Sequence, residues 1–83
     1  MNRALIVVDV QESFRRRPYF REQDLSGFLR NAQSLVNRCQ ARGIPVVQVF
    51  HRELPDDPAN PFSEASGCVR TMPELSLCPE VVV

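Results

Sequence analysis

The sequence predicts an α/β fold built around a parallel sheet, and three features carry this prediction. Ala4 to Val8 is an unbroken apolar run rich in β-branched residues, which is typical of a strand buried on both faces. Residues 24–42 have the pattern of an amphipathic helix, and residues 46–50 form a second apolar run. Strand, helix and strand in this order make a βαβ unit, which crosses over right-handed and leaves its two strands parallel.

The predicted helix carries one apolar stripe, and both of its ends have recognisable signals. Asp24 or Ser26 is expected to cap the start by accepting hydrogen bonds from free backbone N–H groups. Gly43 stands where a left-handed residue ends a helix, and Pro45 cannot continue one. The stripe consists of residues spaced three and four apart: Leu25, Phe28, Leu29, Ala32, Leu35, Val36 and Cys39.

The second half of the chain is poorer in regular structure. Residues 54–73 form a long polar loop, a kind of segment that is often functional, and residues 72–75 are expected to turn. Val81, Val82 and Val83 read as the start of another buried parallel strand. We therefore expect residues 1–83 to be the amino-terminal portion of a single larger domain. Such a portion would expose an apolar sheet face and an unpaired strand edge, which favours a homo-oligomer.

Composition excludes several classes of protein. With a formal net charge of zero, the chain lacks the basic excess of a non-specific nucleic-acid binder. Its first apolar run is too short for a secretory or transmembrane segment, so no membrane partner is expected. The three cysteines, Cys39, Cys68 and Cys78, fit no disulfide or zinc spacing, which points to free thiols in a reducing cytoplasm. Cys39 lies on the helix stripe and is predicted to be core.

Two polar residues follow predicted strands and should meet at one edge of the sheet. Asp9 ends the first strand and His51 follows the second. Ligands of open α/β sheets bind beyond the carboxyl ends of the strands, so Asp9 is a candidate for chemistry. The structural alternative is that Asp9 caps the following turn through local backbone bonds. Arg15, Arg16 and Arg17 are interpreted either as a solvated loop face or as an anion or partner contact.

These residues resemble the opening of the isochorismatase-like cysteine hydrolases, the superfamily of isochorismatases, nicotinamidases and related amidohydrolases. The first strand of that family ends in an Asp, any residue and a Gln, followed by an aromatic residue; here these are Asp9, Gln11 and Phe14. Residues 41–47, the strand end at 49–51, and the segments 60–62 and 72–75 are also similar to the family, in the same order.

The resemblance implies a Rossmann-like, doubly wound, three-layer (αβα) parallel sheet, present here only as its first βαβ part. It also implies an Asp, Lys and Cys mechanism in which the Asp accepts the thiol proton and the thiolate attacks a carbonyl carbon. Asp9 matches that Asp, while Gln11, Phe14 and His51 would lie near a small-molecule substrate. The structural alternatives are that Gln11 is a turn residue, that Phe14 packs in the core and that His51 only caps the strand. The sequence contains no Lys, and none of its cysteines matches the nucleophile, so we expect this portion alone to be inactive.

Other chemistries are not supported. Haloacid-dehalogenase phosphatases need a second Asp where the chain has Gln11, and dinucleotide-binding folds need a glycine-rich turn after the first strand. His51 with Glu53 and neighbouring Asp residues offers too few nitrogen ligands for a metal site, so we expect neither metal nor cofactor. The alternative to an enzyme is a non-catalytic, truncated remnant or interaction module that keeps an α/β half-fold.

Overall fold

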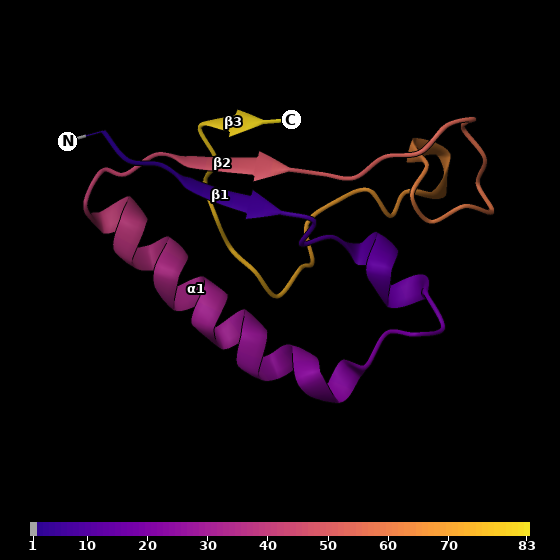
Figure 1. The fold of residues 1–83 in the computed structure, drawn as a ribbon, viewed down its shortest axis with the longest axis horizontal. Helices are drawn as coiled ribbons and strands as arrows, with labels where there is room; N and C mark the ends of the chain where they lie inside the picture. Colours follow the sequence, from indigo (N-terminus) through magenta and orange to yellow (C-terminus); the bar gives the residue numbers. More distant parts are fainter. Residues whose placement is uncertain (1) are drawn as a thin grey trace.

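The computed structural model describes residues 2–83 and contains one sheet, one long helix and several short 3-10 turns (Figure 1). In chain order the elements are β1 (Leu5–Val8), η1 (Glu12–Arg16), η2 (Glu22–Asp24), α1 (Leu25–Ala41), β2 (Val46–Val49), η3 (Glu64–Ser66) and β3 (Val81–Val82). The expected α/β class is confirmed. No helix within residues 2–83 is long and apolar enough to cross a bilayer.

The sheet has the order β1-β2-β3, and both strand pairs are parallel. Leu5 pairs with Val46 and Val8 with Val49, so β1 and β2 end at the same edge. The predicted βαβ unit is therefore confirmed. β3 adds to the far side of β2 through the pairing of Val47 with Val81. No described strand lies on the other side of β1.

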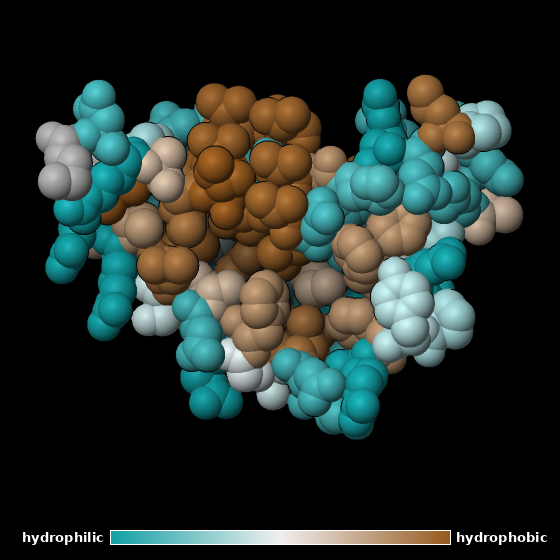
Figure 2. Space-filling view, viewed as in Figure 1, coloured by the Kyte–Doolittle hydropathy of each residue, from teal (hydrophilic) through white to brown (hydrophobic). Residues whose placement is uncertain are grey.

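Helix α1 covers one face of the sheet (Figure 1). Val7 and Val46 point to this face and are buried with Leu29 and Val36 of the helix. The opposite face is open: Ile6 and Val8 are 58% and 55% exposed. Figure 2 shows the resulting apolar patch over the strands. The pattern of the first strand is typical of burial on both faces, but α1 covers only one of them; the predicted exposed apolar sheet face and unpaired strand edge are confirmed for the described residues.

The helix ends differ in how well the sequence predicted them. At the carboxyl end Gly43 has φ of 69°, and the amides of Ile44 and Gly43 donate to the carbonyls of Cys39 and Gln40 at 2.8 and 3.1 Å. This is a Schellman motif, as the glycine predicted. At the start, Asp24 is already helical and makes no capping bond. Its carboxylate lies 3.3 Å from Arg21 Nε, so the predicted side-chain cap is wrong.

The apolar stripe of α1 is narrower than the sequence pattern suggests. Leu25, Leu29, Val36 and Cys39 are buried, in agreement with the prediction, and Cys39 is a free thiol of the interior. Phe28 and Leu35, which belong to the same predicted stripe, are each 49% exposed. The sheet is a single layer of short strands. It is too narrow to cover the side chains at both edges of the apolar stripe of this 17-residue helix.

The segment after β2 returns under the sheet before it forms β3. Met72 and Leu75 are buried in the main core, and the amide of Leu75 donates to the carbonyl of Met72 at 3.0 Å, which confirms the predicted turn. Thr71 forms an isolated antiparallel bridge with Gln11. The long loop is thereby tied to the segment that leaves β1.

Candidate functional site

Asp9 stands at the carboxyl end of β1 in an unusual backbone conformation. Its amide donates to the carbonyl of Val49 at 2.9 Å, which continues the β1–β2 ladder. Its φ is 60°, in the left-handed region that costs most residues energy and that Asp and Asn tolerate best. Residues held in such conformations concentrate at functional sites.

The side chain of Asp9 is half-buried and makes no hydrogen bond or ion pair to any residue from 2 to 83. A carboxylate that capped the turn would accept a backbone N–H bond, and none is seen here. The carboxylate is therefore available to a group that lies outside the described residues.

Asp9 lines an open pocket of about 290 Å³ at the carboxyl edge of the sheet. We call it the Asp9 pocket, and its lining residues are Asp9, Phe14, Arg17, Tyr19, His51, Glu53 and Phe62. Two of the residues predicted to accompany Asp9, Phe14 and His51, thus share its pocket. Their direct contact with a substrate stays a prediction.

Aromatic rings form the wall of this pocket. Phe62 is buried, and the rings of Phe14 and His51 meet it edge-on with centroids 4.9 and 5.2 Å away. The guanidinium of Arg17 lies 5.9 Å from the ring centroids of both Tyr19 and Phe62. Sequence reasoning did not assign Phe62 to the site. The available signal was its position as the sole aromatic residue in the polar loop 54–73.

His51 is held at the pocket by a second carboxylate. Its Nε2 lies 3.0 Å from Glu53 Oε2, and Asn60 Nδ2 donates to Glu53 Oε1, also at 3.0 Å. The hydrogen bond from Asn60, and then that from His51, lower the pKa of Glu53 below its usual range. Glu53 therefore stays ionised and supports the imidazole.

Gln11 does not line the Asp9 pocket, although it was predicted to bind substrate. Its side chain is completely buried. The amide oxygen accepts from the backbone N–H of His51 at 2.8 Å, while Nε2 donates to the His51 carbonyl at 2.9 Å. Nε2 also donates to Ser13 Oγ at 2.7 Å. The Gln11 side chain therefore binds the backbone of His51 and does not line the pocket.

A second, mainly apolar hollow of about 310 Å³ adjoins the site. Asp9 and Phe14 belong to both hollows, and the second is completed by residues that include Val8 and the half-exposed Phe28. Asp9 thus stands between a polar and an apolar concavity. This position suits a catalytic group that acts on a small molecule with both polar and apolar parts.

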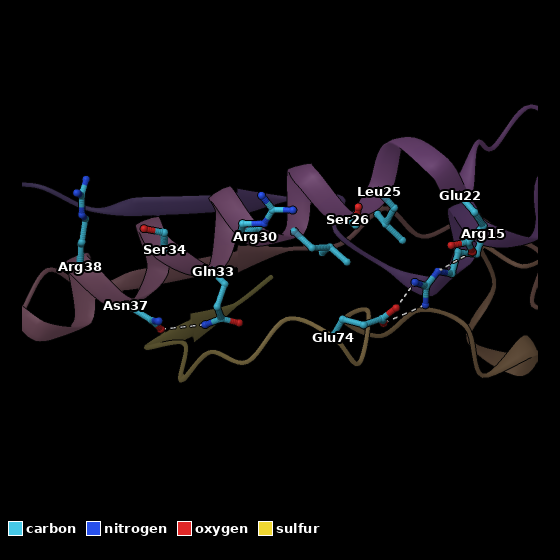
Figure 3. A pocket seen from close by; sticks show the side chains of 11 residues that line it. Arg15, Glu22, Leu25, Ser26, Arg30, Gln33, Ser34, Asn37, Arg38 and Glu74 are labelled. Atoms are coloured by element: carbon cyan, nitrogen blue, oxygen red, sulfur yellow. Dashed lines mark hydrogen bonds and ion pairs between the residues drawn. The ribbon is translucent and has the colours of Figure 1, made fainter.

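A larger cavity, of about 740 Å³, lies elsewhere, along α1 and the segment around Glu74 (Figure 3). No predicted site residue lines it. Arg15 stands at one end, bound to Glu12 at 2.7 Å, to Glu22 at 3.1 Å and to Glu74. Arg15 is thus neither a solvated loop residue nor a free anion contact, because three carboxylates of the chain neutralise it. The volume of this cavity therefore does not make it the candidate site.

The cysteines and acidic residues do not assemble a further centre around Asp9. Cys39 and Cys68 are buried, Cys78 is exposed, and none of the three lines the Asp9 pocket. Within residues 2–83, no group of three His, Cys, Asp or Glu side chains is placed to hold a metal ion.

Comparison with known proteins gives one finding. The family model described as an isochorismatase domain matches residues 3–82. Neither the curated proteins nor the solved structures include a match.

Proposed function

This chain belongs to the isochorismatase family, and on that premise we propose that the intact protein is a cysteine-dependent hydrolase in which Asp9 is the base. The family assignment indicates a hydrolase-type superfamily. The proposed substrate is a small molecule with an amide-type C–N bond or a vinyl ether. The single observation that carries the role of Asp9 is its unpartnered carboxylate at the end of β1, held in a left-handed conformation beside a pocket.

The proposed reaction begins with transfer of a thiol proton to the Asp9 carboxylate. The resulting thiolate attacks the substrate carbonyl carbon, the C–N bond breaks, and the leaving nitrogen takes up a proton. Water then hydrolyses the thioester and regenerates the thiol. No Lys occurs in the 83 residues and no cysteine lines the Asp9 pocket. We therefore place the lysine and the nucleophile in sequence outside these residues.

The same proposal extends to the whole domain. Residues 1–83 would be the amino-terminal portion of one domain with a doubly wound, three-layer sheet. Elements of the remaining portion would cover the open face of β1, where Ile6 and Val8 are exposed. We expect the intact protein to be a cytoplasmic homo-oligomer without nucleic-acid or membrane partners. Gln11, Phe14 and His51 would support or contact the substrate.

A second candidate function is a non-catalytic module that retains the half-fold. It is favoured by the separation of Cys39, Cys68 and Cys78 from Asp9. The coding sequence after Val83 distinguishes the two. A lysine codon within a few residues and a later cysteine before a helix support the enzyme, whereas a stop codon with neither supports the module.

The experiment that tests the enzyme is an assay of the intact protein against a panel of small amides, with and without prior alkylation of its thiols. We expect release of the amine or ammonia, and its loss after alkylation. Hydrolysis that survives complete alkylation would contradict a cysteine mechanism.

A further inference from the structure

Gln11 makes the only contacts within residues 2–83 in which a fully buried side-chain amide binds both backbone groups of another residue. The regular β1–β2 pairing ends at Val8 and Val49. Beyond it, the Gln11 side-chain amide takes the place of a continued β1 and pairs with the backbone of His51 as a peptide group would. It therefore extends the ladder to the residue that carries the imidazole.

The connection continues on the other side of Gln11. Its Nε2 bonds Ser13 Oγ, which in turn donates to the carbonyl of Cys68 at 2.9 Å. The amides of Glu12 and Ser13 donate to the carbonyls of Arg70 and Cys68 at 2.9 and 3.0 Å. Three segments that are distant in the sequence are thus joined through Gln11 and Ser13, and two of them continue into residues that line the Asp9 pocket, namely Phe14 and His51.

We propose that Gln11 is a positioning residue that fixes the backbone at His51 and thereby holds the imidazole against Glu53 and the Phe62 ring, in the pocket that Asp9 also lines. Its meaning for catalysis rests on the proposed function. The contacts of Gln11 and His51 can be measured without a substrate. If the test below fails, the proposed role of Asp9 is unaffected. If the intact protein proves inactive, the proposed role of Gln11 in placing His51 is unaffected.

The chain offers a matched control for this contact. Gln33 on α1 binds the backbone of Ser76 in the same two-bond manner: Oε1 accepts from the Ser76 amide and Nε2 donates to its carbonyl, each at 2.7 Å. Gln33 lines the cavity along α1 (Figure 3) and is not among the residues that line the Asp9 pocket. Gln33→Met therefore removes the same chemistry without touching His51.

The measurement is proton NMR of protein labelled at histidine. His51 is the single histidine, so its ring and amide signals need no assignment. The wild type should show nuclear Overhauser contacts between the His51 and Phe62 rings. We expect Gln11→Met to lose them and Gln33→Met to keep them. Retention in Gln11→Met, or equal loss in both variants, would overturn the proposal.

Two further measurements keep the test decisive if Gln11→Met does not fold. In the wild type, the His51 amide should exchange with solvent roughly tenfold or more slowly than the amides of exposed loop residues, because it donates to a buried oxygen. Exchange as fast as that of the loop would refute the bond. Gln11→Glu keeps the shape, and its carboxyl regains a donor when protonated. As the pH is lowered toward the ordinary carboxyl pKa of about 4.3, the His51–Phe62 contacts should therefore recover more in Gln11→Glu than in the wild type, which lacks the added carboxyl, and equal changes in the two proteins would count against the role.

Discussion

At the scale of single residues, Asp9 has two unusual features: a carboxylate that is free to react and a backbone conformation that few residue types adopt. Its carboxylate makes no bond to residues 2–83, whereas the carboxylate of Glu53, in the same pocket, is bound by His51 and Asn60. A functional role explains why an unpartnered carboxylate occupies a position with φ of 60°. Stability alone would favour glycine there.

Substitutions at Asp9 should separate strain from chemistry. Asp9→Gly should leave the free energy of unfolding within about 0.5 kcal/mol of the wild type, because relief of strain offsets the added chain entropy. Asp9→Ala should lower the free energy of unfolding by about 1 kcal/mol, because the Cβ of Ala is strained in the left-handed conformation and Ala has no side chain that could compensate. Urea denaturation measures both values, and equal stability of the two variants would speak against strain at this position.

Arg15 and Glu74 link η1 to the segment before β3, and their pairing should make stability depend on pH. The hydrogen bond from Arg15 lowers the pKa of Glu74 below its ordinary value of 4.5. A carboxyl with a lowered folded-state pKa stabilises the fold above its unfolded value, and this contribution is lost as the pH falls through the folded value. The free energy of unfolding should therefore decrease from about pH 5 downward.

Glu74→Gln should flatten this acid slope, while Glu80→Gln serves as control because the Glu80 side chain bonds to no described residue. Denaturation curves at several pH values give the slopes. An unchanged slope in Glu74→Gln would show that the pair contributes nothing measurable, which is the usual outcome for fully exposed pairs.

At the scale of elements, one glycine lies inside helix α1 and another just after it, and the two have opposite structural roles. Gly43 ends the helix with φ of 69°, whereas Gly27 lies inside it, and an added Cβ would meet no atom within 4 Å at either position. The effect of substitution is therefore conformational. Gly43→Ala should destabilise the protein by about 1 kcal/mol, and Gly27→Ala should stabilise it by about 0.5–1 kcal/mol. Thermal melts of the two variants should shift in opposite directions; a shift in the same direction would contradict the assignment of the helix end.

The elements were largely predictable, because local periodicity and turn residues determine them. The βαβ order and the Gly43 helix end follow from neighbouring residues. The exposure of Phe28 does not, since it depends on how wide a sheet the helix finds beneath it. The same limit applies to the site: Asp9 follows from its strand, but the bonds of Gln11 join residues 40 positions apart. No local pattern encodes such a contact.

At the scale of the whole molecule, the sheet has one covered and one open face. Ile6, Val8 and Val81 are more than half exposed, and Figure 2 shows an apolar patch over the strands. β1 also has no described partner on its outer edge. Exposed apolar surface and an unpaired strand edge both favour association with another surface.

The 83-residue chain should therefore associate in a concentration-dependent manner, and Ile6→Thr with Val8→Thr should shift it toward monomer. Leu54→Thr is the control, because Leu54 is 76% exposed but lies in the loop after β2. Sedimentation equilibrium measures the distribution. A monomeric wild type at high concentration would show that the open face does not drive association.

The most direct test of the account is the turnover of Asp9→Asn in the intact protein. Asn tolerates the left-handed conformation and keeps the shape of Asp but cannot accept the thiol proton. Asp57→Asn is the matched control, because Asp57 accepts the Ala59 amide at 2.9 Å through an oxygen that Asn retains. We predict that kcat/KM falls by about 10²- to 10⁴-fold in Asp9→Asn, the range of a lost general base, and is unchanged in Asp57→Asn. Activity of Asp9→Asn equal to that of the control would contradict the assignment of Asp9 as the catalytic base.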